Sequence, residues 1–315
     1  MDIYIRTRGS SIDYNFLLKE HPRLPNLNEY RSDFEQPTCI LERLEQDKLY
    51  LFLSGIPSQR KDHQGTPLRY NLVVKSGNWV DHGDNDGNAE NNGLINLIWM
   101  WLNDVREALQ ETQEEGKSSK RVRLPAIAKS ELGKHLDTAF PEEYIEELLK
   151  LTVERNWTPD QKNKLDSKKK ELDDTLKRLI SQIRSDPEGQ QPDHNYWWGG
   201  IDDDDSCNQW IKLVEKLLKG DTQGKALLLN IATPKSLGRL SVGENEQLGV
   251  LLAKENYRSQ PKQIEPIDLP KTNNSTTPHP IVELPKTVRN SITQFLKNPK
   301  DTIKKNMGQE EKKKD

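Results

Sequence analysis

The sequence predicts an α+β fold: a mixed or antiparallel sheet, a helical section, and a disordered linker that leads to a C-terminal amphipathic helix. Residues 49–74 contain two strand-like runs on either side of a loop rich in Gly and Pro. Residues 94–219 repeatedly place apolar side chains at helical spacing. Residues 256–285 are rich in Pro, Thr, Asn and Ser, a composition typical of a disordered linker.

The bulk composition indicates a modest hydrophobic core and no dominant charge. Hydrophobic residues make up 32% of the 315 residues and charged residues 31%, so much of the chain should be solvated helix or tail. The 47 basic and 50 acidic residues nearly cancel, which gives no global attraction to nucleic acid or to an anionic membrane. Cys39 and Cys207 lie far apart, and the N-terminus has no secretory apolar region. We therefore expect a cytoplasmic, bacterial protein.

Four strand-like runs predict the N-terminal sheet, at residues 3–6, 39–44, 49–53 and 69–75. The third run is apolar throughout, as expected for a strand covered on both faces. The fourth run alternates, and its predicted polar face carries Arg69, Asn71, Val73 and Lys75.

The remaining segments around this sheet are less regular. Residues 12–37 predict an irregular connection with one short helix near residues 14–18. Two later apolar runs, 226–232 and 248–253, predict buried strands. These late strands either complete the N-terminal sheet or belong to a separate small α/β unit, and the sequence leaves both open.

The helical section begins after a polar loop at residues 81–93. A helix is predicted from Leu94 to about Glu114, and a short one over 124–136. Pro141 followed by two glutamates predicts another helix start. Thr158 and Gln161 predict a capping box for a long helix that ends near Ile183. Its narrow apolar seam is typical of a coiled-coil-like pair that packs on one partner rather than in a core. A last helix around Trp210 ends at Gly220.

Five parts of the chain follow from these patterns. They are an N-terminal sheet with a covering helix (1–115), a helical section with the coiled-coil-like helix (116–190), a helix with two strands that either rejoin the first sheet or stand apart (191–255), a disordered linker (256–285) and a basic amphipathic tail (286–315).

The loop between the third and fourth strand runs carries candidate anion-contacting side chains. Arg60, Lys61, His63 and Arg69 would offer guanidinium donors and a group that titrates near neutral pH to a phosphate or carboxylate. A merely solvated loop is the simpler interpretation, because no Ser or Cys nucleophile and no second acid or base has a fixed spacing to His63. We predict no catalytic residue from the sequence.

The acidic run Asp202–Asp205 invites a metal-binding interpretation, but it directly precedes a helix, where carboxylates cap the N-terminus and favour its dipole. The polar loop at 81–93 fails the EF-hand template. We therefore expect no metal ion and no cofactor.

Two apolar features are candidates for binding a protein partner. Trp197 and Trp198, beside two glycines, either form an exposed aromatic patch or close over the core. In the tail, Val288, Ile292, Phe295 and Leu296 form a stripe among basic side chains, as in a tethered helix that docks in a partner's groove. A membrane surface is the rival target for the tail, and a functionless solvated extension is the simpler interpretation.

These features favour a non-enzymatic adaptor or scaffold in a cytoplasmic multiprotein assembly, with the C-terminal helix recruiting the partner. The alternatives are a metal-dependent enzyme acting on phosphate esters, which would use His63 with the acidic run, and a nucleic-acid-binding protein. Nucleic acid is disfavoured as a partner because the residues that follow Trp197 and Trp198 are acidic.

Overall fold

The structure is a computed structural model. It describes residues 2–18, 36–45, 48–76, 86–114, 127–154, 157–184, 194–229, 245–252 and 265–266, and single residues at 22, 34, 187, 189, 240 and 243. The chain divides into two units, Met1–Pro270 and Lys271–Asp315. Every described residue lies in the first unit. The predicted tail (286–315) and all of the predicted linker except Glu265–Pro266 are outside the described residues.

Among the described residues, one nine-stranded mixed sheet forms the centre of the first unit, so the predicted α+β class is confirmed. The strand order is β2-β1-β5-β4-β3-β7-β8-β6-β9. In chain order the strands are β1 (Asp2–Thr7), β2 (Asn15–Phe16), β3 (Thr38–Glu45), β4 (Lys48–Lys61), β5 (Pro67–Ser76), β6 (Tyr196–Gly200), β7 (Gln223–Leu229), β8 (Glu246–Leu252) and β9 (Glu265–Pro266).

The N-terminal half of the sheet is built from the predicted antiparallel hairpins. β3 pairs with β4, with Ile40 opposite Phe52. β4 pairs with β5, with Phe52 opposite Val73. β1 joins the other edge of β5. The predicted polar face of β5 is covered as well, because Asn71 and Val73 are fully buried.

The late strands join this same sheet, which decides between the two arrangements that the sequence left open. β7 pairs antiparallel with β3, with Leu227 opposite Ile40. β8 pairs parallel with both β7 and β6. The strands of 191–255 and those of 1–115 therefore share one sheet.

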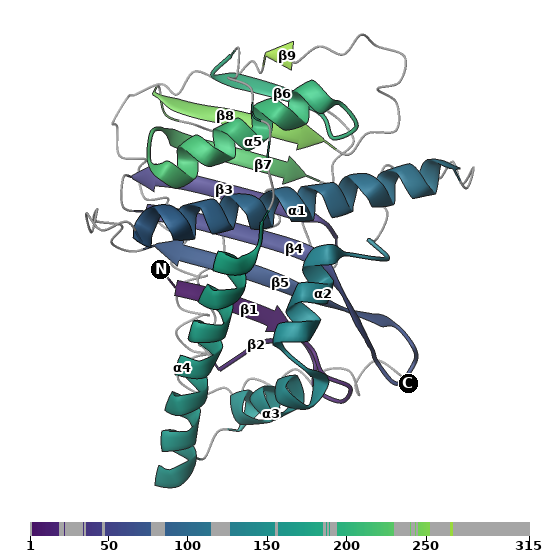
Figure 1. The fold of residues 1–315 in the computed structure, drawn as a ribbon, viewed down its shortest axis with the longest axis vertical. Helices are drawn as coiled ribbons and strands as arrows, with labels where there is room; N and C mark the ends of the chain where they lie inside the picture. The colour runs from purple at the N-terminus through teal and green to yellow at the C-terminus, as the bar shows by residue number, and fades with distance from the viewer. Residues whose placement is uncertain are drawn as a thin grey trace, which may run out of the picture. The chain divides into compact units, whose positions relative to one another are not determined.

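The described helices are α1 (Asp86–Glu114), α2 (Glu131–Ala139), α3 (Glu142–Val153), α4 (Pro159–Gln182) and α5 (Asp204–Lys219). Four of them, α1, α2, α4 and α5, cross one face of the sheet (Figure 1). The main hydrophobic core lies between this face and the helices, around Leu51, Leu53, Trp101 and Trp210. None of the described helices is both long and apolar enough to cross a lipid bilayer.

The opposite side of the sheet, called here the second face, carries its own cluster of buried side chains. This cluster consists of Phe16, Ile40, Phe52, Val73, Trp198, Leu227, Leu229, Leu240, Leu248, Val250 and Leu252. Alternate residues of a strand point to opposite faces of the sheet. A strand that contributes to both clusters is therefore apolar at consecutive positions.

Three predicted local structures were wrong. The segment near residues 14–18 contains β2 instead of a helix. The short helix predicted over 124–136 is α2, which begins only at Glu131. Helix α1 begins at Asp86, inside the predicted polar loop. The low helix propensity of Asn, Asp and Gly is overridden there by tertiary packing. An added Cβ at Gly93 would come within 2.6 Å of the Ile180 carbonyl oxygen, so this glycine permits close approach of α1 to α4.

The coiled-coil-like seam of α4 is also corrected. Its capping box at Thr158 and Gln161 is present as predicted. Its apolar residues, however, belong to the main core, where α4 contacts α1 and α2. The buried positions of the helix are Leu165, Leu172, Leu176, Leu179 and Ile180. The seam is part of the folding core and does not offer a partner-binding surface.

Candidate functional site

The predicted anion-contacting residues do not converge. Arg60 is buried, with 8% of its surface exposed. Lys61 and His63 are both exposed on the loop surface and share no contact with Arg60 among the described interactions. Arg69 is half-buried, and its Nη1 donates a hydrogen bond to the Ile127 carbonyl oxygen at 2.5 Å. The loop therefore presents solvated and internally bonded side chains in different directions.

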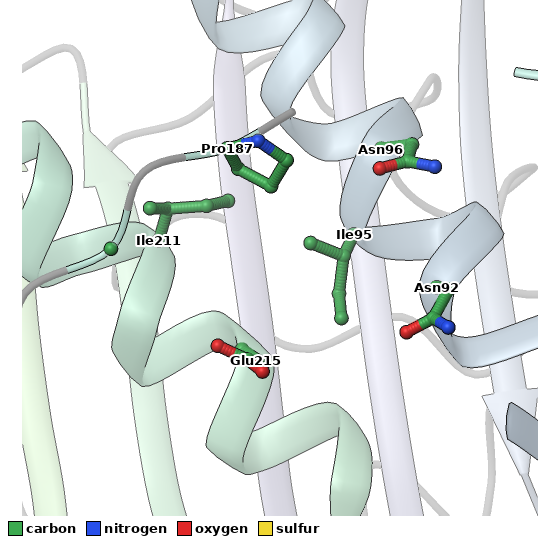
Figure 2. A pocket seen from close by; sticks show the side chains of 7 residues that line it. Asn92, Ile95, Asn96, Pro187, Ile211 and Glu215 are labelled. Carbon is green, nitrogen blue, oxygen red and sulfur yellow. The ribbon is translucent and has the colours of Figure 1, made fainter. Parts of the chain in front are cut away.

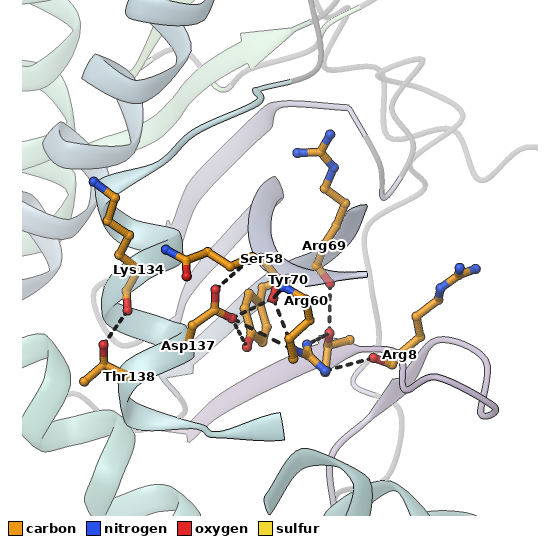
Figure 3. Close-up of polar contacts among 10 residues, drawn as sticks. Arg8, Ser58, Arg60, Arg69, Tyr70, Lys134, Asp137 and Thr138 are labelled. Carbon is orange, nitrogen blue, oxygen red and sulfur yellow. Dashed lines mark hydrogen bonds and ion pairs between the residues drawn. The ribbon is translucent and has the colours of Figure 1, made fainter. Parts of the chain in front are cut away.

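Arg60 instead belongs to a polar cluster that joins β4 and β5 to α2, and the centre of this cluster is Asp137 (Figure 3). Asp137 Oδ1 accepts hydrogen bonds from Ser58 Oγ at 2.6 Å and from Tyr70 Oη at 2.8 Å. Its Oδ2 accepts from the Gln59 backbone N–H at 2.7 Å. Arg60 Nε lies 3.9 Å from Oδ1. One carboxylate thus receives donors from two strands, which its several lone pairs allow.

The Arg60 guanidinium is engaged inside the protein. Its Nε donates to Ser58 Oγ at 3.1 Å, its Nη2 to Thr7 Oγ1 at 2.8 Å and its Nη1 to the Arg8 carbonyl oxygen at 3.2 Å. It also lies 5.0 Å from the centre of the Tyr70 ring. Because all three of its nitrogens donate internally, Arg60 links β1 to β4 and is not presented to a ligand.

The hairpin loop beyond Arg60 is organised by Asp62. Its Oδ1 accepts the backbone N–H groups of Gln64 at 2.9 Å and Thr66 at 2.8 Å, and its carboxylate pairs with Arg8. The hydrogen bond from Thr66, supported by that from Gln64 and by the Arg8 charge, holds the pKa of Asp62 below its ordinary value. This carboxylate shapes the turn, leaving Lys61 and His63 on its outer surface.

The hydrogen bonds of the Asp137 cluster hold α2 against the β4–β5 hairpin. Burial raises the pKa of Tyr70 well above its ordinary value, and the neighbouring Asp137 carboxylate adds to the shift. The phenol therefore stays protonated and donates to Asp137 at neutral pH. Sequence reasoning missed Ser58, Tyr70 and Asp137, because nothing in their spacing connects α2 to the β4–β5 hairpin.

Of the two alternatives that the sequence left open for Trp197 and Trp198, the structure shows the buried one, which contradicts their assignment as an exposed partner-binding patch. Trp197 has no exposed surface and Trp198 has 5%. They occupy neighbouring positions in β6, so their rings enter the main core and the second-face cluster respectively. An added Cβ at Gly249 would lie 2.6 Å from the Trp197 ring, so β8 keeps a glycine where that ring packs.

The acidic run caps α5, as the sequence indicated. Asp203 is the N-cap residue and accepts from the Ser206 backbone N–H at 2.9 Å. Asp204, in the first turn, pairs with Arg106 of α1. Within the described part of the chain, no three His, Cys, Asp or Glu side chains group closely enough to hold a metal ion.

A surface cavity of about 290 Å³ lies between α1 and α5. Figure 2 shows Ile95 of α1 and Ile211 of α5 pointing toward the same space, with Pro187 above them. Asn92, Asn96 and Glu215 form its polar rim. Hydrogen bonds from Lys212 and Lys219 lower the pKa of Glu215, so its carboxylate stays ionised and paired with the two lysine side chains. Sequence patterns carry no signal for this cavity, because its walls come from separate helices.

No protein-family model, curated protein or solved structure matches the chain. The predicted tail residues Val288, Ile292, Phe295 and Leu296 lie outside the described residues.

Proposed function

We propose that this protein is a non-enzymatic adaptor of a cytoplasmic, bacterial multiprotein assembly, and that it recruits a protein partner through residues 286–315. The first unit, Met1–Pro270, contains every described element, and residues 271–315 form a second unit. An interaction segment attached to a folded unit has this organisation.

The sequence of the second unit supplies the chemistry of recognition. The spacing of Val288, Ile292, Phe295 and Leu296 would place them on one side of a helix, and residues 286–305 hold six basic side chains against one acid. A partner with an apolar groove bordered by carboxylates would match both features. Trp197, Trp198 and the α4 seam are buried in the first unit, so the proposal rests on the tail alone.

Co-purification from the native host tests this function. The full chain is compared with a chain that lacks residues 286–315 and with the double variant Ile292→Glu, Phe295→Glu. Both changes should remove the same partner, because they delete or charge the apolar stripe. The double variant Asn290→Glu, Gln294→Glu adds equal charge away from the stripe and should retain that partner. An unchanged set of partners in the deletion would refute the proposal.

Binding to vesicles separates a protein groove from the membrane alternative. The full chain should bind no more strongly to vesicles that contain anionic lipid than to neutral ones at physiological salt. Strong binding to anionic vesicles, lost in the Ile292→Glu, Phe295→Glu variant, would show that the tail is a membrane anchor instead.

A further inference from the structure

Three polar side chains near the β1–β5 strand pair present nitrogen donors that have no acceptor in the described part of the chain. Arg6 Nε and Nη1, Arg8 Nε and Asn71 Nδ2 are all buried nitrogens without a hydrogen-bond partner among the described residues. Buried donors in native proteins are almost always paired with protein, water or ligand. Several unpaired nitrogen donors in neighbouring side chains therefore indicate an acceptor that the described residues do not provide.

The strand register brings Arg6 and Asn71 together on the second face. They are direct partners in the antiparallel pair of β1 and β5, which places their Cα atoms about 4.5–5.5 Å apart. Val73, two positions along β5 from Asn71, belongs to the second-face cluster, and Tyr4, two positions before Arg6, packs against it. Alternation along each strand therefore directs both side chains to this face.

Both guanidinium groups lie close to the same aromatic ring, that of Tyr14. The Arg6 guanidinium carbon lies 3.7 Å from the centre of the Phe34 ring and 5.0 Å from that of Tyr14. The Arg8 guanidinium carbon lies 5.6 Å from the same Tyr14 ring. Rings that cover the flat faces of a guanidinium leave its N–H edge for hydrogen bonding. Phe34 itself is fixed by edge-on contact with Phe52, 5.8 Å between ring centres.

Existing bonds orient the free donors. The Asn71 side-chain oxygen accepts the Gly55 backbone N–H at 3.3 Å, so the amide nitrogen is the end left without a partner. Arg8 uses its Nη2 to pair with Asp62, which leaves its Nε free. Arg6 and Arg8 are both half-buried, and Figure 3 shows the Arg8 side chain directed away from the Asp137 cluster. Each of these two side chains is partly exposed, while its unpaired nitrogens are covered.

We propose that Arg6, Arg8 and Asn71 bind a phosphate group, as free phosphate or as a small phosphate monoester. The free donors come from one side chain on β1, one on β5 and one just after the end of β1, which suits the several oxygens of a tetrahedral oxyanion better than a flat carboxylate. Of the two guanidinium charges, that of Arg8 is paired with Asp62 and that of Arg6 lies near Asp13, and a bound anion would interact favourably with both. This site is separate from the predicted Arg60–His63 loop, and it is independent of the tail.

Calorimetric titration of the full chain at constant ionic strength tests the site, with inorganic phosphate, methyl phosphate and acetate as probes. Saturable binding of inorganic phosphate or of methyl phosphate, with acetate at least about tenfold weaker, is the expected result. Whichever of the two phosphate probes binds more tightly then shows whether the site takes free phosphate or a phosphate monoester. Absence of saturable phosphate binding, or tighter binding of acetate, would overturn the assignment.

Substitutions then locate the site. Arg6→Gln should weaken phosphate binding at least about tenfold, because it removes a charged donor. Asn71→Asp keeps the acceptor for Gly55 but places a carboxylate opposite Arg6, so it should abolish phosphate binding. The midpoint of thermal unfolding of this variant should be no lower than that of the unsubstituted protein, because the introduced carboxylate can pair with Arg6. This midpoint shows whether the variant is folded.

Lys61→Gln is the matched control for the Arg6 change. It removes an exposed charge from the nearby loop and should leave the affinity for phosphate unchanged. Equal weakening by Lys61→Gln and Arg6→Gln would show non-specific attraction and refute the site.

Discussion

Arg60 and Asp137 show how single polar side chains join the β4–β5 hairpin to α2. Arg60 is bonded to Ser58, Thr7 and the Arg8 carbonyl, and Asp137 accepts from Ser58, Gln59 and Tyr70. Both residues serve folding, because each of these donors has an internal acceptor. At a buried site such a network is stabilising only while it stays complete.

The substitution Arg60→Met measures this role. It retains an apolar stem next to Tyr70 but removes the donors to Ser58 and Thr7. We expect the free energy of unfolding to fall by about 1.5–3 kcal/mol, as for hydrogen bonds made by a buried charged group. Urea denaturation followed by circular dichroism gives this value.

Lys61→Met is the matched control, because the neighbouring side chain is exposed. Its effect should stay within about 0.5 kcal/mol. If Arg60→Met is equally neutral, Arg60 is not a structural residue and an external ligand for it must be reconsidered.

The sequence singled out Arg60 but assigned it the wrong environment. A basic residue in a hairpin loop is usually solvated, and the partners that bury Arg60 lie at Thr7 and Asp137, far from it in the chain. Trp197 and Trp198 failed for a related reason. In a short strand that is covered on both faces, two adjacent aromatic residues are both buried, one on each face. The sequence does not show what covers each face.

At the scale of elements, local signals were the most dependable. The capping box of α4, the Asp203 cap of α5 and the left-handed Gly220 that ends α5 all occur where their residue types predict them. The start of α1 and the strand β2 were missed, because tertiary contacts override the weak propensities of Asn, Asp and Gly.

Helix α2 depends on a glycine for its contact with β4. A Cβ at Gly133 would lie 1.9 Å from the Pro57 carbonyl oxygen. Alanine is favoured over glycine by about 0.8–1 kcal/mol within a helix, but overpacking against backbone costs about 1–3 kcal/mol. We expect Gly133→Ala to destabilise the protein overall, measured as a lower urea midpoint.

His135→Ala, at an exposed position of the same helix, should change the midpoint little. A rise in stability for Gly133→Ala would mean that α2 does not approach β4 this closely.

At the scale of the whole molecule, β3 joins two halves that are far apart in the chain. It pairs with β4 on one side and with β7 on the other, and the main core is shared across both halves. The sequence left this connection open, because local periodicity carries no information about which distant strands pair. For the same reason it could not place Asp137 against Tyr70, or Arg6 beside Asn71.

A shared sheet and core predict one cooperative unfolding transition for the first unit. Leu51→Ala in β4 and Leu228→Ala in β7 should each lower the stability by about 2–5 kcal/mol, because both side chains are fully buried. Each should shift the whole transition, with tryptophan fluorescence and far-UV circular dichroism giving superimposable curves.

Gln223→Ala, at an exposed position of β7, is the control and should leave the curve in place. A biphasic curve for Leu228→Ala, with one phase unmoved, would show that the late strands unfold as a separate domain.

The position of β3 also affects the newly made chain. Its hairpin partner β4 follows at once, whereas β7 leaves the ribosome much later. Until then one edge of β3 is unpaired beside the apolar residues Cys39, Ile40 and Leu41, and such edges recruit other chains. Pairing of β7 with β3 also closes a long loop. The chain loses conformational entropy before the stabilising contacts form, which makes this step slow. The half-synthesised protein is therefore the form most exposed to aggregation, and the form for which a chaperone would matter most.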